Sequence, residues 1–264
     1  MPIIMHEGLA DTPHARLWHW DTGGTGDTII LCHPASQGCA IWEHQRDSFS
    51  AAGFRVVAYA RRGYDQSETG TPDTGTAIED LSNLMDWLKI ERAHLLGAAA
   101  GGITVTGFAV AHPARTISAV LAGTIISPDE DEWRKIYGRL GIAAVRDTVS
   151  VDFLELGPAF RAANPEGTKR FITLSSEAKP DKLVTQALGV TVNWQALENL
   201  QVPVLLITGE ADLYAPPPLH ELIASHLPNP QMKTMRAIGH APYWEAPNSF
   251  DDIVLDFLKS VPVD

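Results

Sequence analysis

The sequence has only two cysteines among its 264 residues, Cys32 and Cys39. Two thiols cannot form the disulfide framework of a small secreted fold, although a single bond between them stays open. No basic segment followed by an apolar one begins the sequence, and no apolar run approaches the roughly 18 residues of a membrane helix. We therefore expect a reducing, cytoplasmic location and no membrane partner.

Basic residues are also scarce, because 20 Lys and Arg stand against 32 Asp and Glu, for a net charge of −12. An acidic surface repels the phosphates of nucleic acids and of anionic lipids, so we expect no nucleic-acid partner. The glycines lack the spacing of a dinucleotide-binding fingerprint, and no cluster of metal ligands is apparent. We expect no cofactor and no metal; the expected partner is a small-molecule substrate, and the composition also allows a homo-oligomer.

What the chain does have is a large share of hydrophobic residues, 45%, which is enough for one large core. Apolar runs typical of buried strands alternate with amphipathic segments typical of helices. This alternation predicts an α/β fold with a mostly parallel central sheet and helices on both faces. After a hairpin in residues 1–27, the expected strands are 28–32, 55–59, 93–96, 118–122, 202–208 and 231–237, and the expected helices are 41–52, 78–88, 103–112 and 248–258.

The alternation is interrupted after Ile126. Residues 128–193 look mostly helical, with polar joints between the helices, and the strands resume near Val202. A helical insertion before the last two strands predicts a cap over the carboxyl ends of the sheet, where open α/β sheets bind ligands. We therefore expect a core in residues 1–127 and 194–264 and a helical cap in residues 128–193.

Residues 97–102 consist of glycine and alanine only, between an apolar strand and a helix. Such small residues suit a sharp strand-turn-helix whose central residue is held at strained backbone angles. In an elbow of the Gly-x-Ser-x-Gly type, this central residue is a nucleophile. Here it is Ala99, whose methyl group cannot attack a carbonyl carbon.

Five segments resemble the α/β-hydrolase fold family, and the resemblance covers nearly the whole chain. The pair 33–34 (His-Pro) is similar to the family's oxyanion loop, 62–67 to its Arg-Gly-x-Gly-x-Ser turn, and 97–101 to its nucleophile elbow. Residues 209–216 look like the acid loop and 239–247 like the histidine loop. The chain order of nucleophile position, acid and histidine is the order that this family uses.

The resemblance implies roles for five residues around the elbow. Ala99 occupies the nucleophile position. Asp212 would orient the imidazole of His240, which would then act as a base or an acid near neutral pH. The backbone N–H groups of Ala35 and Ala100 would form an oxyanion hole, which needs no side chain at the elbow.

Four further side chains are candidates for binding the substrate. Trp133 and Tyr137 could stack on an apolar or aromatic group, or they could pack within the cap. Arg161 could hold a carboxylate with two hydrogen bonds, or it could be a solvated helix residue. Trp42 could touch the ligand or pack at the floor of its pocket.

Three functions are compatible with an elbow that lacks its nucleophile. The first is a serine hydrolase of a small carbonyl substrate, such as an ester, a lactone or an activated C–C bond, in which Ala99 replaces the serine by engineering or by natural loss. The second is an enzyme in which the His240–Asp212 pair works without a covalent intermediate, as a water-activating hydrolase, a lyase or a cofactor-free oxygenase. The third is a ligand-binding protein without catalysis.

A replacement nucleophile is a further alternative. Cys39 and Ser36 both lie near the expected oxyanion loop, but no feature of the sequence lowers the pKa of either group. Water activated by His240 fits better, because the methyl group of Ala99 leaves room for it. Taken together, the residues predict a hydrolase.

Overall fold

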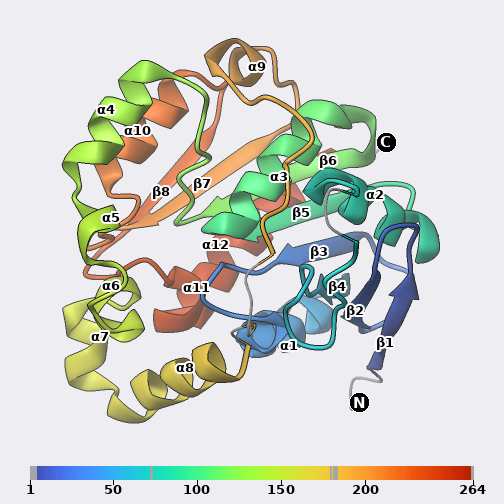
Figure 1. The fold of residues 1–264 in the computed structure, drawn as a ribbon, viewed down its shortest axis with the longest axis horizontal. Coiled ribbons are helices and arrows are strands. Elements are labelled where there is room, and N and C mark those ends of the chain that lie inside the picture. Colours follow the sequence, from blue (N-terminus) through green and yellow to red (C-terminus); the bar gives the residue numbers. More distant parts are fainter. Residues whose placement is uncertain (1–4, 72–73, 179, 181–183, 263–264) are drawn as a thin grey trace.

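The computed structural model describes residues 5–71, 74–178, 180 and 184–262. Its centre is one sheet of eight strands in the order β1-β2-β4-β3-β5-β6-β7-β8 (Figure 1). The strands are β1 (His6–Asp11), β2 (Arg16–Asp21), β3 (Thr28–Cys32), β4 (Arg55–Tyr59), β5 (Ala93–Ala98), β6 (Thr116–Ala122), β7 (Val204–Gly209) and β8 (Gln231–Met235). Strand β2 pairs antiparallel with β1 and with β4, and all other neighbours are parallel, which confirms the predicted mostly parallel sheet.

Helices cover both faces of this sheet, and several others connect the strands. The helices are α1 (Glu43–Ala51), α2 (Ala77–Trp87), α3 (Ala100–Ala111), α4 (Asp131–Arg139), α5 (Ile142–Val145), α6 (Val151–Glu155), α7 (Pro158–Ala163), α8 (Pro165–Ala178), α9 (Trp194–Glu198), α10 (Pro217–Ser225), α11 (Pro242–Glu245) and α12 (Pro247–Ser260), with short 3-10 turns η1 (Cys39–Trp42) and η2 (Pro113–Arg115). The expected helix over 41–52 thus begins as η1 and continues as α1. Helix α10 was not among the expected elements.

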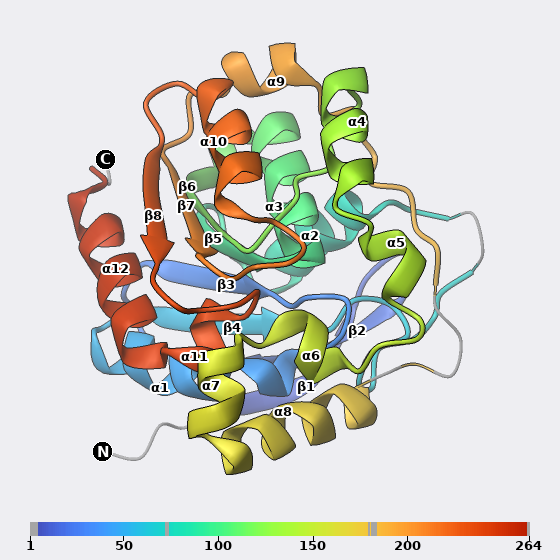
Figure 2. The same ribbon diagram turned by 90° about the vertical axis from the view of Figure 1, so that its left-hand side faces the viewer.

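Alternate residues of the buried strands point to opposite faces and produce two hydrophobic cores. Ile30 packs in the core beneath α2, α3 and α10, whereas Ile29 and Leu31 pack in the core beneath α1 and α12. Figure 2 shows the sheet between these two groups of helices. Because both faces are covered, the central strands are continuous apolar runs, as expected for a parallel sheet.

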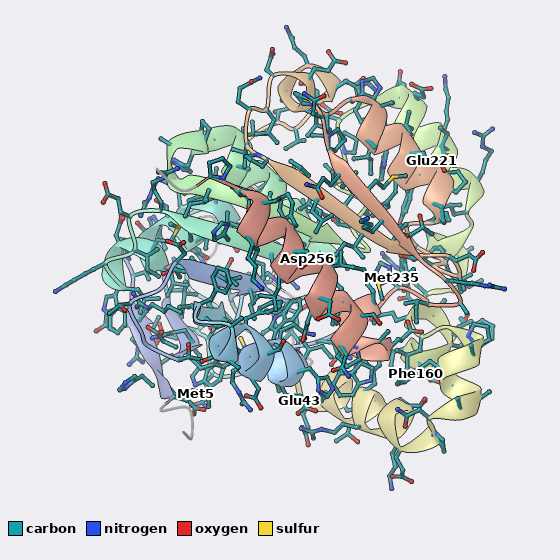
Figure 3. All side chains as sticks on the ribbon, turned by 180° about the vertical axis from the view of Figure 1, so that it is seen from behind. Met5, Glu43, Phe160, Glu221, Met235 and Asp256 are labelled. Carbon is teal, nitrogen blue, oxygen red and sulfur yellow. The ribbon has the colours of Figure 1, made fainter. Side chains whose placement is uncertain are left out.

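Helix α12 covers the same face of the sheet as α1. Its buried residues include Phe250, Val254 and Phe257, which recur at the spacing of one helical face, while Asp256 is exposed. Seen from behind in Figure 3, α12 lies across the sheet beside α1. The predicted final helix is therefore confirmed, with bounds that differ by one or two residues.

The expected helical insertion lies between β6 and β7 and contains α4–α8. Figure 1 shows α4–α8 along the side toward which the arrow of β3 points, which is the carboxyl end of the parallel strands. Residues 184–193 form no helix. The backbone carbonyls of Ala187 and Leu188 instead accept hydrogen bonds from the N–H groups of Ala77 and Ile78 at the start of α2. No helix in the described part of the chain is long and apolar enough to cross a bilayer.

Candidate active site

Ala99 connects β5 to α3 in a strained backbone conformation, with φ 46° and ψ −112°. Its N–H donates to the carbonyl of Ala122 (2.9 Å), and its own carbonyl accepts hydrogen bonds from the Thr124 hydroxyl (2.8 Å) and the Gly102 N–H (3.0 Å). Such backbone angles cost a non-glycine residue about 1–3 kcal/mol and persist only where the surroundings impose them. The chain therefore keeps the sharp elbow although the residue at its tip has no hydroxyl group.

The glycines around the elbow allow α3 to approach the sheet closely. A Cβ atom at Gly101 would lie 2.0 Å from the Cys32 carbonyl oxygen, and one at Gly102 would lie 2.4 Å from the Thr124 hydroxyl. A Cβ atom at Gly97 would lie 2.6 Å from the backbone of Gly101. Glycine is thus required at these three positions, because backbone atoms approach Gly97 and Gly101 and the Thr124 side chain approaches Gly102.

Asp212 and His240 follow β7 and β8, and the structure brings them into contact. The Nδ1 atom of His240 lies 2.9 Å from each carboxylate oxygen of Asp212. Because a carboxylate only accepts, Nδ1 carries the proton and Nε2 is the ring nitrogen left for other work. Asp212 is held in turn by the backbone N–H groups of Tyr214 (2.8 Å) and Ala215 (2.9 Å).

The pair and the elbow meet at the carboxyl end of β6. Ala122, the last residue of β6, accepts the Ala99 N–H. At the next residue, Gly123, a Cβ atom would lie 3.2 Å from His240 Nδ1 and 3.4 Å from an Asp212 oxygen. Residues from three distant parts of the sequence therefore converge at one edge of the sheet.

The two residues predicted to form the oxyanion hole, Ala35 and Ala100, lie just after the ends of two neighbouring strands. Ala100 is the first residue of α3, so its N–H has no partner inside the helix. Ala35 lies in the loop after β3, and its carbonyl accepts a hydrogen bond from the Tyr64 hydroxyl (2.8 Å). Both Ala99 and Ala100 retain partial exposure, so the surface beside the elbow is accessible to water.

His33 holds the loop of Ala35 in place. Burial and the nearby Arg61 lower the pKa of His33 to about 3, so the ring is neutral. Its Nδ1 lies 2.8 Å from the Pro34 carbonyl and donates to it, and its Nε2 accepts the Arg61 N–H at 3.0 Å. The loop is therefore fixed by a neutral histidine with both nitrogens satisfied.

His240 lies in a buried and acidic environment, with 4% of its surface exposed. Burial acts to lower the pKa of its imidazole, but the Asp212 carboxylate acts in the other direction, and Glu155 and Glu245 add to this, so that the pKa is raised overall. The ring of Tyr214 lies over it, with 4.6 Å between the ring centroids. The imidazole is thus well suited to accept a proton and to hold it.

Glu155 belongs to this site although no motif in the sequence indicated it. It ends α6 and is buried; its Oε2 accepts a hydrogen bond from the Ser36 hydroxyl (2.7 Å). Its backbone carbonyl accepts the N–H of His240 (2.8 Å). The only local signal was a carboxyl group between Leu154 and Leu156, two residues that are both buried.

The four candidates for substrate binding differ in burial and do not form one cluster. Trp133 is buried and stacks on the partly exposed Tyr137, with 4.7 Å between ring centroids, and Asp212 contributes to the raised pKa of Tyr137 after burial itself. Arg161 lies over the ring of Phe153 at 4.7 Å. Trp42 is fully buried against Tyr243, so it packs in the core and offers no surface to a ligand. Of the four, only Tyr137 is both partly exposed and influenced by the charge of Asp212.

The cysteines are both free and both buried. Burial, with the neighbouring Asp65 carboxyl, raises the pKa of Cys39 well above its usual value, and burial raises the pKa of Cys32 to about 12. A protonated, buried thiol is a poor nucleophile, which argues against Cys39 in that role. Across the described residues, no three His, Cys, Asp or Glu side chains are placed to hold a metal ion.

Residues 27–247 match the model of the α/β hydrolase fold, so the chain belongs to this family. It is 25% identical to the 2-hydroxy-6-oxo-6-phenylhexa-2,4-dienoate hydrolase of Burkholderia cepacia, over 92% of this chain and 91% of that one. A thermophilic esterase from Thermogutta terrifontis shares the fold with a TM-score of 0.80 and 23% identity, over 98% of this chain and 100% of that one. The enol-lactonase of Burkholderia xenovorans LB400 does so with a TM-score of 0.76 and 23% identity, over 96% and 100%. A hydrolase is therefore the class of enzyme that the family and these relatives indicate.

Proposed function

We propose that this protein hydrolyses a small carbonyl compound, an ester, a lactone or an activated C–C bond, and that water takes the place of the missing elbow nucleophile. The proposal rests on one observation: His240 Nδ1 lies 2.9 Å from each carboxylate oxygen of Asp212, beside the strained elbow at Ala99. A general base needs an imidazole of fixed orientation, and the contact with Asp212 supplies that orientation. A serine mechanism, in turn, needs a hydroxyl group that position 99 lacks.

The carbonyl class of substrate is supported by what the similar proteins are named for. The Burkholderia cepacia relative is a hydrolase of an oxo-dienoate, and the structural neighbours are an esterase and an enol-lactonase. The substrates named for these three enzymes are all cleaved by attack of an oxygen nucleophile on a carbonyl carbon. The proposed site supplies a base and two N–H donors for such an attack.

In the proposed mechanism, His240 Nε2 takes a proton from water while the water oxygen bonds to the carbonyl carbon. The carbonyl oxygen becomes negative and accepts hydrogen bonds from the N–H groups of Ala35 and Ala100, each worth about 3–4 kcal/mol to the transition state. The C–O or C–C bond to the leaving group then breaks, the carbonyl group reforms as a carboxylic acid, and the leaving group is protonated. Asp212 stabilises the imidazolium between these two events.

We further propose that residues 128–193 act as the cap that selects the substrate, with the partly exposed Tyr137 facing it and the buried Trp133 supporting the ring of Tyr137. Helix α6 of this segment is fastened to the histidine loop by the hydrogen bond from the His240 N–H to the Glu155 carbonyl. A cap held in this way would exclude bulk water and admit the single water molecule that reacts.

The test is turnover of p-nitrophenyl acetate, enol-lactones and an oxo-dienoate in water labelled with ¹⁸O. We expect hydrolysis by the unmodified chain, one labelled oxygen in the acid product of a single turnover, and at least a 100-fold loss in His240→Ala. His44→Ala, an exposed histidine, serves as the matched control. Turnover that survives His240→Ala, or a product without label, would refute water activation, and an acyl adduct in the mass spectrum would indicate a nucleophile elsewhere.

A further inference from the structure

Glu155 has a buried carboxyl group that takes no part in the hydrolysis proposed above. It is 7% exposed and lies between the oxyanion loop, through Ser36, and the histidine loop, through the N–H of His240. Among the described residues, it forms no ion pair with an arginine or a lysine. A buried carboxylate without a cationic partner is unfavourable unless it carries a proton or serves a reaction.

The groups around Glu155 come from several elements. Its backbone carbonyl accepts the N–H of His240 in the histidine loop, and its charge also acts on Tyr214 of the acid loop and on Tyr243 of α11. Burial raises the pKa of Glu155; His240 and the Ser36 hydroxyl act in the other direction, and Asp212 adds to the rise. The carboxyl group therefore holds its proton to a higher pH than an exposed glutamate does.

Ser36 directly follows Ala35, whose N–H is the proposed oxyanion donor, and its side chain is partly exposed. Its hydroxyl donates a hydrogen bond of 2.7 Å to the Glu155 carboxyl, one residue along the chain from the proposed oxyanion donor. A hydroxyl group can accept one proton while it donates another, so it can pass a proton from a carboxylic acid to a neighbouring oxygen atom.

Building on the proposed function, we propose that Ser36 and Glu155 form a relay that delivers a proton to the leaving group of the substrate. As the C–O bond breaks, the Ser36 hydroxyl, which donates to Glu155 in the structure, turns to give its proton to the departing oxygen and accepts a proton from the Glu155 carboxyl. The carboxylate then recovers a proton from the His240 imidazolium, which had taken it from water. All protons balance, and the relay allows His240 to act on the water while a different group acts on the leaving oxygen.

The relay would extend the range of leaving groups that the site can release. A phenolate leaves without assistance, whereas the alkoxide of an aliphatic ester or a lactone needs a proton as its bond breaks. The site should therefore accept esters with poor leaving groups, not only activated aryl esters.

The test measures kcat/KM for acetate esters of p-nitrophenol, phenol and trifluoroethanol in wild type, Glu155→Gln and Ser36→Ala. Both variants should lose about 100-fold on the trifluoroethyl ester and less than about threefold on the p-nitrophenyl ester, because only the poor leaving group needs the proton. Glu166→Gln, at an exposed glutamate of α8, should match the wild type on all three esters.

An equal loss on all three esters, or no loss, would overturn the relay while leaving the water mechanism in place. If Glu155→Gln fails to fold, Ser36→Ala decides the question alone, since it removes the relay and leaves the carboxyl group intact. An unmodified chain that hydrolyses none of the esters overturns both proposals, a result distinct from the loss of leaving-group dependence.

Discussion

The hydroxyl of Thr124 donates a hydrogen bond of 2.8 Å to the carbonyl oxygen of Ala99. Together with the bond from the Ala99 N–H to Ala122, it clamps a residue that has φ 46° from both sides. The strained turn is therefore imposed by the end of β6 and does not depend on the side chain at position 99. This explains why an alanine can occupy an elbow that otherwise presents a nucleophile.

Replacing Thr124 with valine should weaken this clamp. The change removes the bond to Ala99 and leaves a partly buried carbonyl group with one partner fewer, so the free energy of unfolding should fall by about 1–2 kcal/mol. Thr173→Val, which removes a hydroxyl bonded to Lys169 on the exposed face of α8, is the control. Urea unfolding of both variants gives the comparison, and equal effects would contradict the role assigned to Thr124.

Ala99→Ser should convert the site to covalent catalysis. The backbone already has the elbow conformation, so a hydroxyl at this position would lie beside the His240 imidazole and become acylated. Stopped-flow absorbance with p-nitrophenyl acetate should show a burst of nitrophenol, with an acetyl adduct in the mass spectrum. The double variant Ala99→Ser, His240→Ala should show neither, and a burst that survives in it would mean that another base activates the serine.

Gly101→Ala should disrupt the fold, whereas Gly138→Ala should not. The new methyl group at 101 would lie 2.0 Å from the Cys32 carbonyl oxygen, and at 138, in α4, it would meet nothing within 4 Å. We expect Gly101→Ala to be insoluble or severely destabilised, and Gly138→Ala to gain up to about 1 kcal/mol from the better helix propensity of alanine. Circular dichroism and urea unfolding test the pair, and a stable Gly101→Ala would show that α3 can move away from β3.

The activity should rise with pH through a value above 6.5, the ordinary pKa of histidine, because His240 must lose its proton to act as a base and its pKa is raised. Burial opposes the rise, and the Asp212 carboxylate is the largest cause of it. In Asp212→Asn, the acid limb of kcat/KM should therefore move to lower pH, and the rate on its plateau should fall because the ring loses its orientation. An acid limb that stays in place would assign it to another group.

Glu245 should make the protein less stable as the pH rises from about 4.5 to about 7. Its carboxyl group accepts hydrogen bonds from Gly157 and Gly239, but burial raises its pKa from 4.5 to about 7. In this window, the unfolded chain has released the proton and the folded chain still holds it, so the free energy of unfolding falls with pH, by at most about 3 kcal/mol.

Urea midpoints at both ends of this pH window measure the effect in the wild type and in Glu245→Gln, which cannot titrate. The stability of the variant should depend less on pH than that of the wild type. Glu166→Gln, at an exposed position, should keep the wild-type dependence. Identical pH dependence in all three proteins would show that Glu245 does not cause the loss of stability.

Much of the fold could be predicted because its signals are local. A buried parallel strand must be a continuous apolar run, so strands such as Thr28–Cys32 and Arg55–Tyr59 have the predicted bounds. The turns that follow such strands lie at one edge of the sheet by topology alone. The pairing of Asp212 with His240 could be predicted because their loops resemble the acid and histidine loops of the α/β-hydrolase family, and the missing nucleophile at Ala99 could be identified from the residue at the elbow.

Other features had no local signal and were decided by the tertiary structure. Ser36 and Glu155 are 119 positions apart, and only the folding of α6 onto the oxyanion loop brings the hydroxyl and the carboxyl group together. Burial of Trp42 against Tyr243 likewise depends on the packing of η1 against α11, and it changes a candidate ligand contact into a core residue. The sequence by itself determined which chemical groups this protein has and the order in which they follow the strands along the chain. The tertiary structure decided which groups share a buried environment, because contacts and desolvation depend on distance in space and not along the chain.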